Sequence, residues 1–480
     1  MTEITPTPPL QPIVPAHHLR VLDGAQLARL QEGTLTLLEE VGVHVPSEMA
    51  CKIYAEHGAR VDFRTQIVRL SREVVRKYMA HAPRTYTLGA RLASHDLQLD
   101  GTRLYCTTDG CGVETIDFTT RQRRTSRKQD VADTARLCDA LSSIGFYWPM
   151  VSAQDFPENA PLHELEASFN NTVKHIQSET VMGERLARSA VEMAKVVAGD
   201  ETTLRTRPPL SLLVCAIAPL AQDRDGLESA LIFAEAGLPV GFMSMANTGS
   251  TAPATLAGTL ITGDAEIISA LVLIQMNTPG APVFHSLMPG IMHPHTGDYL
   301  ATAWEGTLLY AAGVELAHRW GVPTLAGVFG TDAPVPGWQS AGDAASSLLL
   351  CALCGAETGA GLGLVEACTL LYPEAVLLDS DIYHRVRIEA GGLEITPETL
   401  ALDVIRSVGP RGNFLKHRHT RDGMRQRKFS TLSNQRNVDG SPADPVEVAR
   451  QQSEHILKTH FPQPLDTQQQ LELRRILEAA

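Results

Sequence analysis

Carboxylate and aromatic side chains recur at the ends of short apolar runs in this sequence. Asp109, Glu179 and Asp332 each follow such a run, and His285 lies near the end of another. The accompanying aromatic residues are Tyr105, Trp148, Phe242 and Trp338. Carboxylates and aromatic faces both attract ammonium groups, so the set would suit a tertiary or quaternary ammonium ligand. Taken singly, His285 also fits a satisfied core histidine, and either tryptophan could simply fill space.

The apolar runs themselves predict the element that would bring these residues together. Eight of them read as strands, at Arg103–Thr107, Gly145–Val151, Thr172–Gln177, Pro209–Ala216, Pro239–Met245, Ala281–Leu287, Pro323–Phe329 and Ala356–Leu364. Helical patterns separate them, at Lys128–Leu141, Leu162–Ser168 with Gly183–Val197, Asp223–Ala236, Ala252–Met276, Tyr299–Trp320 and Gly342–Cys354. Strands that alternate with helices favour a closed (β/α)₈ TIM barrel over an open doubly wound sheet.

The carboxyl ends of such strands are where parallel α/β folds bind ligands and do chemistry. The stretch Val322 to Gly342 passes from an apolar strand to a polar loop and then to a helix start. It also fits a plain strand-to-helix turn. No glycine fingerprint of the GxGxxG or GxxxxGK[ST] type follows any predicted strand, which weakens the dinucleotide and P-loop alternatives.

Composition excludes several classes of partner. The chain has 480 residues, 44% hydrophobic and 20% charged residues, and a formal net charge of −13, so it has no basic footprint for nucleic acid. The apolar segment 251–280 is interrupted by Asp264 and Glu266, which argues against a membrane span. Residues 1–15 are rich in proline and lack the order of a secretory signal. We therefore expect a cytoplasmic protein.

We expect four regions along the chain. Residues 1–15 form a disordered proline-rich arm, residues 16–100 an N-terminal α/β lobe, residues 101–400 the barrel domain and residues 401–480 a C-terminal helical extension. The lobe shows amphipathic helical spacing and no cluster of acids or bases, so packing or assembly is its expected role. The charged, glutamine-rich tail suggests a homo-oligomer.

The cysteines and histidines do not form a recognisable metal site. The eight cysteines are scattered through a long chain, which indicates reduced thiols. Cys351 and Cys354 have CxxC spacing within an apolar helical run, where core packing is the expected role. A metal at His293 and His295 is conceivable, but no carboxylate and thiolate set completes a zinc site, and we expect no metal.

Several motifs resemble the trimethylamine:corrinoid methyltransferase superfamily. They are WPMVSAQD (Trp148–Asp155), KHIQSET (Lys174–Thr180), GFMSMANTGSTAPATLAG (Gly241–Gly258), AGVFGTDAPVPGWQSAGDAASSLLLCALCGAETG (Ala326–Gly359) and ETLALDVIRSVGPRGNFLKHRHT (Glu398–Thr420). The resemblance implies a (β/α)₈ barrel and a cytoplasmic enzyme. It also implies methyl transfer from a methylated amine to the Co(I) of a separate corrinoid protein, with no cofactor held tightly by this chain.

The sequence departs from the archaeal founding members of that superfamily in one loop. Those enzymes carry pyrrolysine after a late barrel strand, whereas Asp332 to Gly342 contains only ordinary residues here. The matching position lies near Gly337 or Trp338, with Gln339 aligned to the glutamine that follows pyrrolysine. Pyrrolysine-free relatives resemble demethylases of quaternary amines such as glycine betaine, which makes a glycine betaine-like substrate the expectation.

The resemblance and the cation chemistry together assign roles. We expect Trp148 and Trp338 to line the cation site, Asp332 and Glu179 to offset its charge, and His285 or Lys174 to contact a substrate carboxylate. The expected catalytic residues are Asp332, Trp338, Gln339 and Glu179, and the expected substrate-binding residues are Trp148, Tyr105, Asp109, Lys174, Phe242 and His285. Alternatives remain open: a barrel lyase or hydrolase that uses acid–base chemistry, and a quaternary-amine-binding protein without activity.

Overall fold

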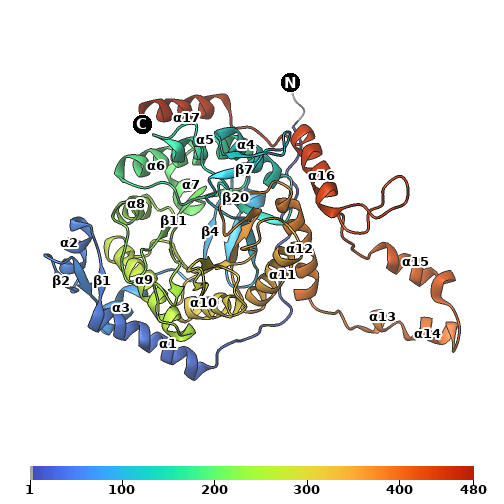
Figure 1. Ribbon diagram of the computed structural model, residues 1–480, viewed down its shortest axis with the longest axis horizontal. Helices are drawn as coiled ribbons and strands as arrows, with labels where there is room; N and C mark the ends of the chain where they lie inside the picture. Colours follow the sequence, from blue (N-terminus) through green and yellow to red (C-terminus); the bar gives the residue numbers. More distant parts are fainter. Residues whose placement is uncertain (1–3) are drawn as a thin grey trace.

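A closed barrel of eight parallel strands forms the centre of the protein (Figure 1). The computed structural model describes residues 4–480. The strands are β6 (Tyr105–Thr108), β9 (Ile144–Tyr147), β10 (His175–Ser178), β11 (Leu210–Cys215), β12 (Val240–Ser244), β14 (Val283–Leu287), β17 (Leu325–Gly327) and β18 (Thr358–Leu362). Each pairs with the next in parallel, and a bridge between His285 and Thr324 closes the ring. The predicted TIM-barrel class is therefore confirmed.

Helices surround the barrel and follow its strands in turn. They are α4 (Lys128–Asp139), α5 (Ala160–Asn171), α6 (Glu184–Ala198), α7 (Glu201–Thr206), α8 (Arg224–Glu235), α9 (Leu256–Asn277), α10 (Gly306–Trp320), α11 (Trp338–Leu353) and α12 (Ala375–Ala390). The helix expected from Tyr299 begins later, at Gly306, because Tyr299 and Leu300 form the short strand β16.

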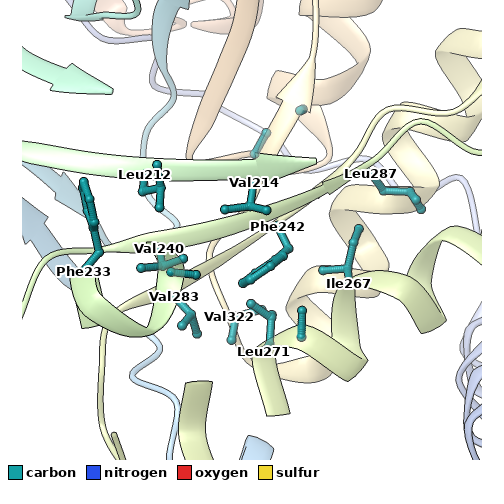
Figure 2. Packing of buried hydrophobic residues seen from close by; sticks show 14 of the residues in the cluster. Leu212, Val214, Phe233, Val240, Phe242, Ile267, Leu271, Val283, Leu287 and Val322 are labelled. Atoms are coloured by element: carbon teal, nitrogen blue, oxygen red, sulfur yellow. The ribbon is translucent and has the colours of Figure 1, made fainter. Parts of the chain in front are cut away.

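Side chains alternate between the barrel interior and the surrounding helices. Val240 and Phe242 of β12 point outward and pack near Ile267 and Leu271 of α9 (Figure 2). The residues between them point into the lumen, where Gly241 leaves the space that the Phe284 ring fills: a Cβ there would lie 2.0 Å from that ring. This period of two decides which strand residues can reach a ligand.

A hairpin closes the amino-terminal end of the lumen. The strands β4 (Tyr86–Leu88) and β5 (Leu97–Leu99) are joined through the 3₁₀ turn Ala93–His95. Their side chains Leu88, Leu97 and Leu99 pack in one cluster with lumen residues of the barrel. Ligand access is therefore left to the carboxyl end.

Two small sheets lie in the loops at that carboxyl end. One contains β13 (Asn247–Thr248), β15 (Gly290–Met292) and β16 (Tyr299–Leu300). The other contains β7 (Glu114–Ile116), β8 (Arg123–Thr125), β19 (Leu364–Val365) and β20 (Leu370–Leu371).

The N-terminal elements pack against α9. They are α1 (Gly24–Thr36), the π-helical turn Leu37–Val41, β1 (Val43–His44), α2 (Glu48–Glu56), β2 (Arg60–Asp62), β3 (Ile67–Arg69) and α3 (Arg72–Met79), with the three strands antiparallel. They cover one side of the barrel (Figure 1). Helix α9 is long and apolar enough to span a membrane by composition, but 83% of its most apolar window is buried.

The N-terminal arm differs from the disorder expected for it. Residues 4–15 run along the barrel, and Ile13 is buried and exchanges backbone hydrogen bonds of 3.0 and 2.8 Å with Leu104. The Tyr383 hydroxyl donates to the Gln11 carbonyl at 2.7 Å. Proline lacks an N–H group but keeps its carbonyl, so an extended proline-rich segment can still be held by donors from the barrel. Residues 1–3 lie outside the described residues.

The C-terminal region consists of short helices followed by two longer ones. The short elements are α13 (Pro397–Leu400), α14 (Leu402–Val408), the 3₁₀ turn Phe414–Lys416 and α15 (Arg418–Arg425). Helix α16 (Pro445–Thr459) packs on α12 and α4, and α17 (Thr467–Ala479) packs on α6 and α5. Helices α13 and α14 are separated at Ala401, whose φ is 50°. The proposed division into four regions stays a prediction.

Candidate functional site

Asp109 lies directly after β6 and is buried with one oxygen unpaired. Its Oδ1 accepts from the Gly110 N–H at 3.1 Å, whereas Oδ2 has no hydrogen-bond partner among residues 4–480. Burial raises the pKa of Asp109 to about 6, although hydrogen bonds from the Cys368 thiol and the Gly110 N–H oppose the shift. A raised carboxyl pKa with an unused oxygen is typical of a functional site.

Glu179 follows β10 and is electrostatically coupled to Asp109. Burial, and then the negative charge of Asp109, raise the pKa of Glu179 to about 8. The two carboxyls therefore hold less negative charge at neutral pH than two ordinary acids would. A cation bound beside them would favour their ionised forms, because opposite charge lowers a carboxyl pKa.

Trp148 completes this group from the end of β9. The side chain is 2% exposed, and its Nε1–H has no hydrogen-bond partner within the described chain. Thr108 fixes the backbone at Trp148, since the Thr108 hydroxyl donates to the Trp148 carbonyl at 2.6 Å and accepts from its N–H at 2.9 Å. A Cβ at position 110 would lie 2.2 Å from Nε1, so Gly110 allows the ring to sit there.

Two amides were missed by sequence reasoning. Gln177 Nε2 and Asn247 Oδ1 are buried and have no partner among residues 4–480. Gln177 lies two residues before Glu179 on β10, so the strand period of two was a signal that could have identified it. Asn247 begins the two-residue strand β13 after β12, and a strand of two residues is too short to show that period.

Thiols and a tyrosine lie next to the two acids. Cys368 lies close enough to Asp109, and Cys111 close enough to both acids, for the charges of the acids to affect the two thiols. Burial raises the pKa of Cys111 and of Cys368 well above the ordinary thiol value. Both thiols are therefore protonated at neutral pH and are poor nucleophiles. The Tyr299 hydroxyl nearby donates to the Met288 carbonyl at 3.0 Å.

Glu164 of α5 orders the loops that carry the site. Its Oε1 accepts from the Ala153 N–H at 3.1 Å and its Oε2 from the Thr180 hydroxyl at 2.6 Å. These bonds connect the loop after β9 to the residue next to Glu179. Glu164 is thus a positioning residue for the acidic pair.

The structure corrects the binding role expected for Lys174. This side chain is 1% exposed at the amino end of β10, and its Nζ donates to the carbonyls of Cys138 and Leu141, each at 2.7 Å. Burial lowers the pKa of Lys174 to about 8, opposed by the charge of Asp139. Lys174 therefore stabilises the base of the barrel wall and is far from the carboxyl-end loops.

His285 and Phe242 also differ from their expected binding roles. His285 Nε2 lies 2.9 Å from Asp264 Oδ1 on α9, and Asp264 accepts in addition from Trp320. Phe242 points outward into the cluster between barrel and helices (Figure 2). Both residues occupy strand positions whose side chains point toward the surrounding helices, so neither can contact a ligand in the lumen.

The loop after β17 departs from the expected geometry. Asp332 Oδ1 accepts from the Ala301 N–H at 3.1 Å, and Oδ2 accepts from Thr302 N–H and Oγ1 at 2.9 and 2.7 Å. Asp332 therefore holds the segment before α10. Trp338 is the first residue of α11 and is 90% exposed, so its side chain lies at the surface instead of lining an enclosed cation site. Gln339 is half-buried on the same helical turn.

Tyr105 lies in the lumen but near its closed end. The ring packs in the cluster that includes Leu97 of the β4–β5 hairpin. Trp148 belongs to the same cluster, so the substrate contact expected for Tyr105 stays a prediction. Of the ten expected site residues, the structure thus brings together Asp109, Trp148 and Glu179.

Candidate metal ligands are dispersed. No group of three or more His, Cys, Asp or Glu side chains arranged to hold a metal occurs among residues 4–480. The rings of His293 and His295 lie 5.8 Å apart in an exposed turn. Cys351 and Cys354 are buried free thiols on and beside α11, as expected for core packing.

The chain matches known proteins over nearly all of its length. A family model described as Trimethylamine methyltransferase (MTTB) matches residues 5–478. The trimethylamine methyltransferase MttB of Desulfitobacterium hafniense (strain DSM 10664 / DCB-2) is 33% identical over 458 residues, which cover 94% of this chain and 92% of that protein. The glycine betaine methyltransferase of Desulfitobacterium hafniense (strain Y51) is 27% identical, with 93% and 94% covered.

Among solved structures, the monomethylamine methyltransferase of Methanosarcina barkeri is similar with a TM-score of 0.48 and 13% identity, covering 90% of this chain and 92% of that one. The family match and the 33% identical relative decide the assignment. The chain belongs to the trimethylamine methyltransferase family and is a methyltransferase.

Proposed function

We propose that this enzyme moves a methyl group from a quaternary methylated amine, of the glycine betaine type, to the Co(I) of a corrinoid protein. The observation that carries the proposal is the pair Asp109 and Glu179 beside Trp148. All three are brought to the carboxyl end of one lumen, and Asp109 Oδ2 and Trp148 Nε1 are buried without partners among residues 4–480. Buried polar groups without partners in a protein alone are expected to meet a ligand.

The two carboxyls would bind and orient the ammonium group. Carboxylates attract a cation strongly where water is excluded, and an indole face adds a cation–π contact of about 0.5–2 kcal/mol. Because binding of a cation favours ionised carboxylates, Glu179 would release its proton when the amine binds near neutral pH. Binding would therefore strengthen as the pH rises toward the pKa of about 8 of the free Glu179 side chain.

A quaternary ammonium suits this site because its methyl group is already activated. Its nitrogen carries a permanent charge, so no proton donor is needed before transfer. The remaining tasks are to hold the cation, exclude water and align the C–N bond, which are positioning effects. The closed hairpin end of the lumen supports water exclusion, and the loop Asp332 to Gly342 carries only ordinary residues where the pyrrolysine enzymes differ.

The contact expected for a substrate carboxylate does not come from Lys174 or His285. Both are bonded to the barrel's own groups outside the lumen. Asp109 and Glu179 would recognise the methylated ammonium group of the substrate. Betaines and quaternary amines without a carboxylate share this group. The substrate screen should therefore include both betaines and quaternary amines without a carboxylate.

An apolar rim at the carboxyl end supports a protein partner there. Large exposed apolar side chains follow six strands, namely Val113, Phe156, Ile217, Met245, Trp304 and Val335 in the loops and Trp338 at the start of α11. Trp304 and Trp338 are 98% and 90% exposed. Aromatic residues of this kind are the usual anchors of protein interfaces. The corrinoid on such a partner would supply the nucleophile that accepts the methyl group, and Co(I) requires the reducing conditions of the cytoplasm.

The test is a demethylation assay with reduced corrinoid and a panel of amines. We expect methyl-cobalamin formation with one or more quaternary amines and weaker transfer from trimethylamine. Glu366→Gln, at a rim acid paired with Arg123, serves as a control that keeps activity. Transfer from none of the amines, with either free corrinoid or corrinoid proteins from methylamine-using organisms, would refute the proposal.

The rim has its own prediction. Trp304→Ala combined with Trp338→Ala removes two exposed anchors without emptying any packed core. We expect the KM for a corrinoid protein to rise about tenfold or more, because tenfold corresponds to about 1.4 kcal/mol and a single interface hot spot contributes about 2 kcal/mol. The rate with free cobalamin should stay the same. Equal loss with both acceptors would place the tryptophans in the substrate site instead.

A further inference from the structure

An arm formed by residues 393–429 extends away from the barrel. It leaves after α12, contains α13, α14 and α15, and returns toward α16 (Figure 1). In that view the arm is the orange segment that projects beyond the body of the molecule. Its place is independent of the carboxyl-end site and of the proposed methyl transfer.

Apolar side chains of the arm have no cover from their own chain. Leu393, Leu415 and Phe429 are 89%, 79% and 72% exposed. The others are Ile395, Leu400, Leu402, Ile405, Phe414 and Met424, all of them exposed large hydrophobics. A soluble protein rarely exposes so many apolar groups in one segment unless another surface covers them.

The arm does not support its own conformation. Its helices have 4, 7 and 8 residues and no buried side chain, and helices this short are not stable alone in water. The side-chain hydrogen bonds of residues 393–429, within the described chain, join residues of the arm to one another. An external surface is therefore needed to order it.

The charge of the arm is opposite to that of the rest of the chain. Between Arg406 and Lys428 there are eight Lys or Arg residues and one acidic residue, Asp422, in a chain whose net charge is −13. Arg406 pairs with Asp403 and Arg418 with Asp422. The other cations have no carboxylate within salt-bridge distance among residues 4–480, namely Arg411, Lys416, Arg421, Arg425, Arg427 and Lys428.

We propose that the arm clasps a second copy of this chain. An identical copy offers an acidic body of complementary charge and is present wherever the arm is. In a two-fold arrangement each chain would give its arm to the other, which covers both sets of apolar side chains at once. The basic side chains would face the partner's acids, and the apolar ones would pack at the centre of the contact.

The first experiment measures the mass of the purified full-length chain by light scattering at micromolar concentration. We expect a dimer or a multiple of it, compared with 52.0 kDa for one chain. The triple variant Leu402→Glu, Ile405→Glu, Leu415→Glu should shift the mass to 52.0 kDa with an unchanged circular dichroism spectrum. The matched control is Met49→Glu, at an exposed apolar position of α2 outside the arm, which should keep the wild-type mass.

A second variant tests the charge argument without adding acids to apolar positions. Arg421→Gln, Arg425→Gln, Arg427→Gln should weaken the assembly about tenfold or more and reduce its sensitivity to salt, because screened ion pairs would be removed. A wild-type chain that is monomeric, or a triple-glutamate variant that keeps the wild-type mass, would overturn the proposal.

A photo-crosslinking amino acid at Leu415 identifies what the arm touches. In the purified chain without any other protein, we expect a product of twice the single-chain mass, with the crosslink joining two copies. Crosslinks found only within one chain would show that the arm folds back on its own body. Crosslinks that form only when a corrinoid protein is added would assign the arm to that partner, and either result would refute arm exchange.

Discussion

Two buried aspartates at opposite ends of the same barrel have opposite pKa shifts. Asp139, near the amino end, accepts from Thr172 Oγ1 at 2.8 Å, Val173 N–H at 2.9 Å, Thr7 Oγ1 at 2.6 Å and His460 Nε2 at 2.7 Å. Burial alone would raise its pKa, but the His460 hydrogen bond and the charge of Lys174 lower it below the ordinary value. Asp109, at the carboxyl end, accepts from one backbone donor, and its Oδ2 has no partner among residues 4–480.

Burial alone therefore does not decide whether the pKa of an acid is raised or lowered. What distinguishes the two aspartates is whether the protein supplies the donors. At the amino end every oxygen of Asp139 is used, and Lys174 supplies a compensating charge. At the carboxyl end burial raises the pKa of Asp109, and burial followed by the charge of Asp109 raises the pKa of Glu179. A ligand cation is the group that would satisfy both acids.

The largest effect should follow from breaking the amino-end network. Asp139→Ala removes the acceptor of four hydrogen bonds and leaves Lys174 buried without a counter-charge. We expect the free energy of unfolding to fall by about 3–5 kcal/mol, the usual cost of breaking a buried ion pair. Urea unfolding followed by circular dichroism measures it. Glu184→Ala on the surface of α6 is the control, and a loss below about 0.5 kcal/mol for Asp139→Ala would contradict the network.

The carboxyl end should respond in activity instead of stability. Asp109→Asn and Glu179→Gln keep size and remove charge, so we expect kcat/KM for the amine to fall about 10²-fold, or close to 3 kcal/mol. Lys174→Met changes the amino end instead. It should lower the free energy of unfolding and keep the kcat/KM of the folded enzyme unchanged. If Lys174→Met lost activity and Glu179→Gln kept it, the assignment of the two ends would be reversed.

The two ends should also differ in their pH dependence. Glu179 has a folded-state pKa of about 8 against 4.5 ordinarily, so the unfolded chain loses its proton first and stability falls between these pH values. Glu179→Gln should therefore raise the thermal midpoint at pH 8 and leave it unchanged near pH 4. Asp139 has a lowered pKa, so its stabilisation is present at neutral pH and is lost as the pH falls through that folded-state value.

Calorimetric titration with the amine tests whether Glu179 releases its proton on binding. Because Glu179 gives up its proton on binding, the measured enthalpy should vary with the ionisation enthalpy of the buffer at pH 7. The variation should disappear in Glu179→Gln. An enthalpy that is the same in all buffers for the wild-type enzyme would contradict proton release from this side chain.

The smallest expected effect concerns Trp148. Trp148→Phe keeps an aromatic face and removes the unpartnered Nε1–H, so the KM for the amine should rise about threefold to fivefold, or roughly 1 kcal/mol. The value of kcat should stay close to that of the wild type. A larger loss of kcat than of affinity would mean that the indole N–H acts in the transfer step itself.

Much of the fold could be predicted from local patterns. Eight apolar runs, the helices between them and the N-terminal elements were identifiable because hydrophobic period and turn residues are properties of short segments. The motifs from Trp148 to Thr420 indicated the family, and the residue types indicated a cation site. The same residue types singled out Asp109, Glu179 and Trp148, whose binding and catalytic roles stay predictions.

The tertiary structure decided which side chains face the lumen and which are satisfied. Register shifts between Cys106 and Thr107 and between Gly359 and Leu362 change which residues of these strands point into the lumen. Such shifts cannot be predicted from the sequence of a single strand. Lys174 and His285 could be separated from the site only through partners distant in sequence, Cys138 and Asp264. The proline-rich residues 4–15 were likewise ordered by the barrel wall. Residue types determine what chemistry is possible, whereas long-range packing determines which polar atoms are left for a ligand.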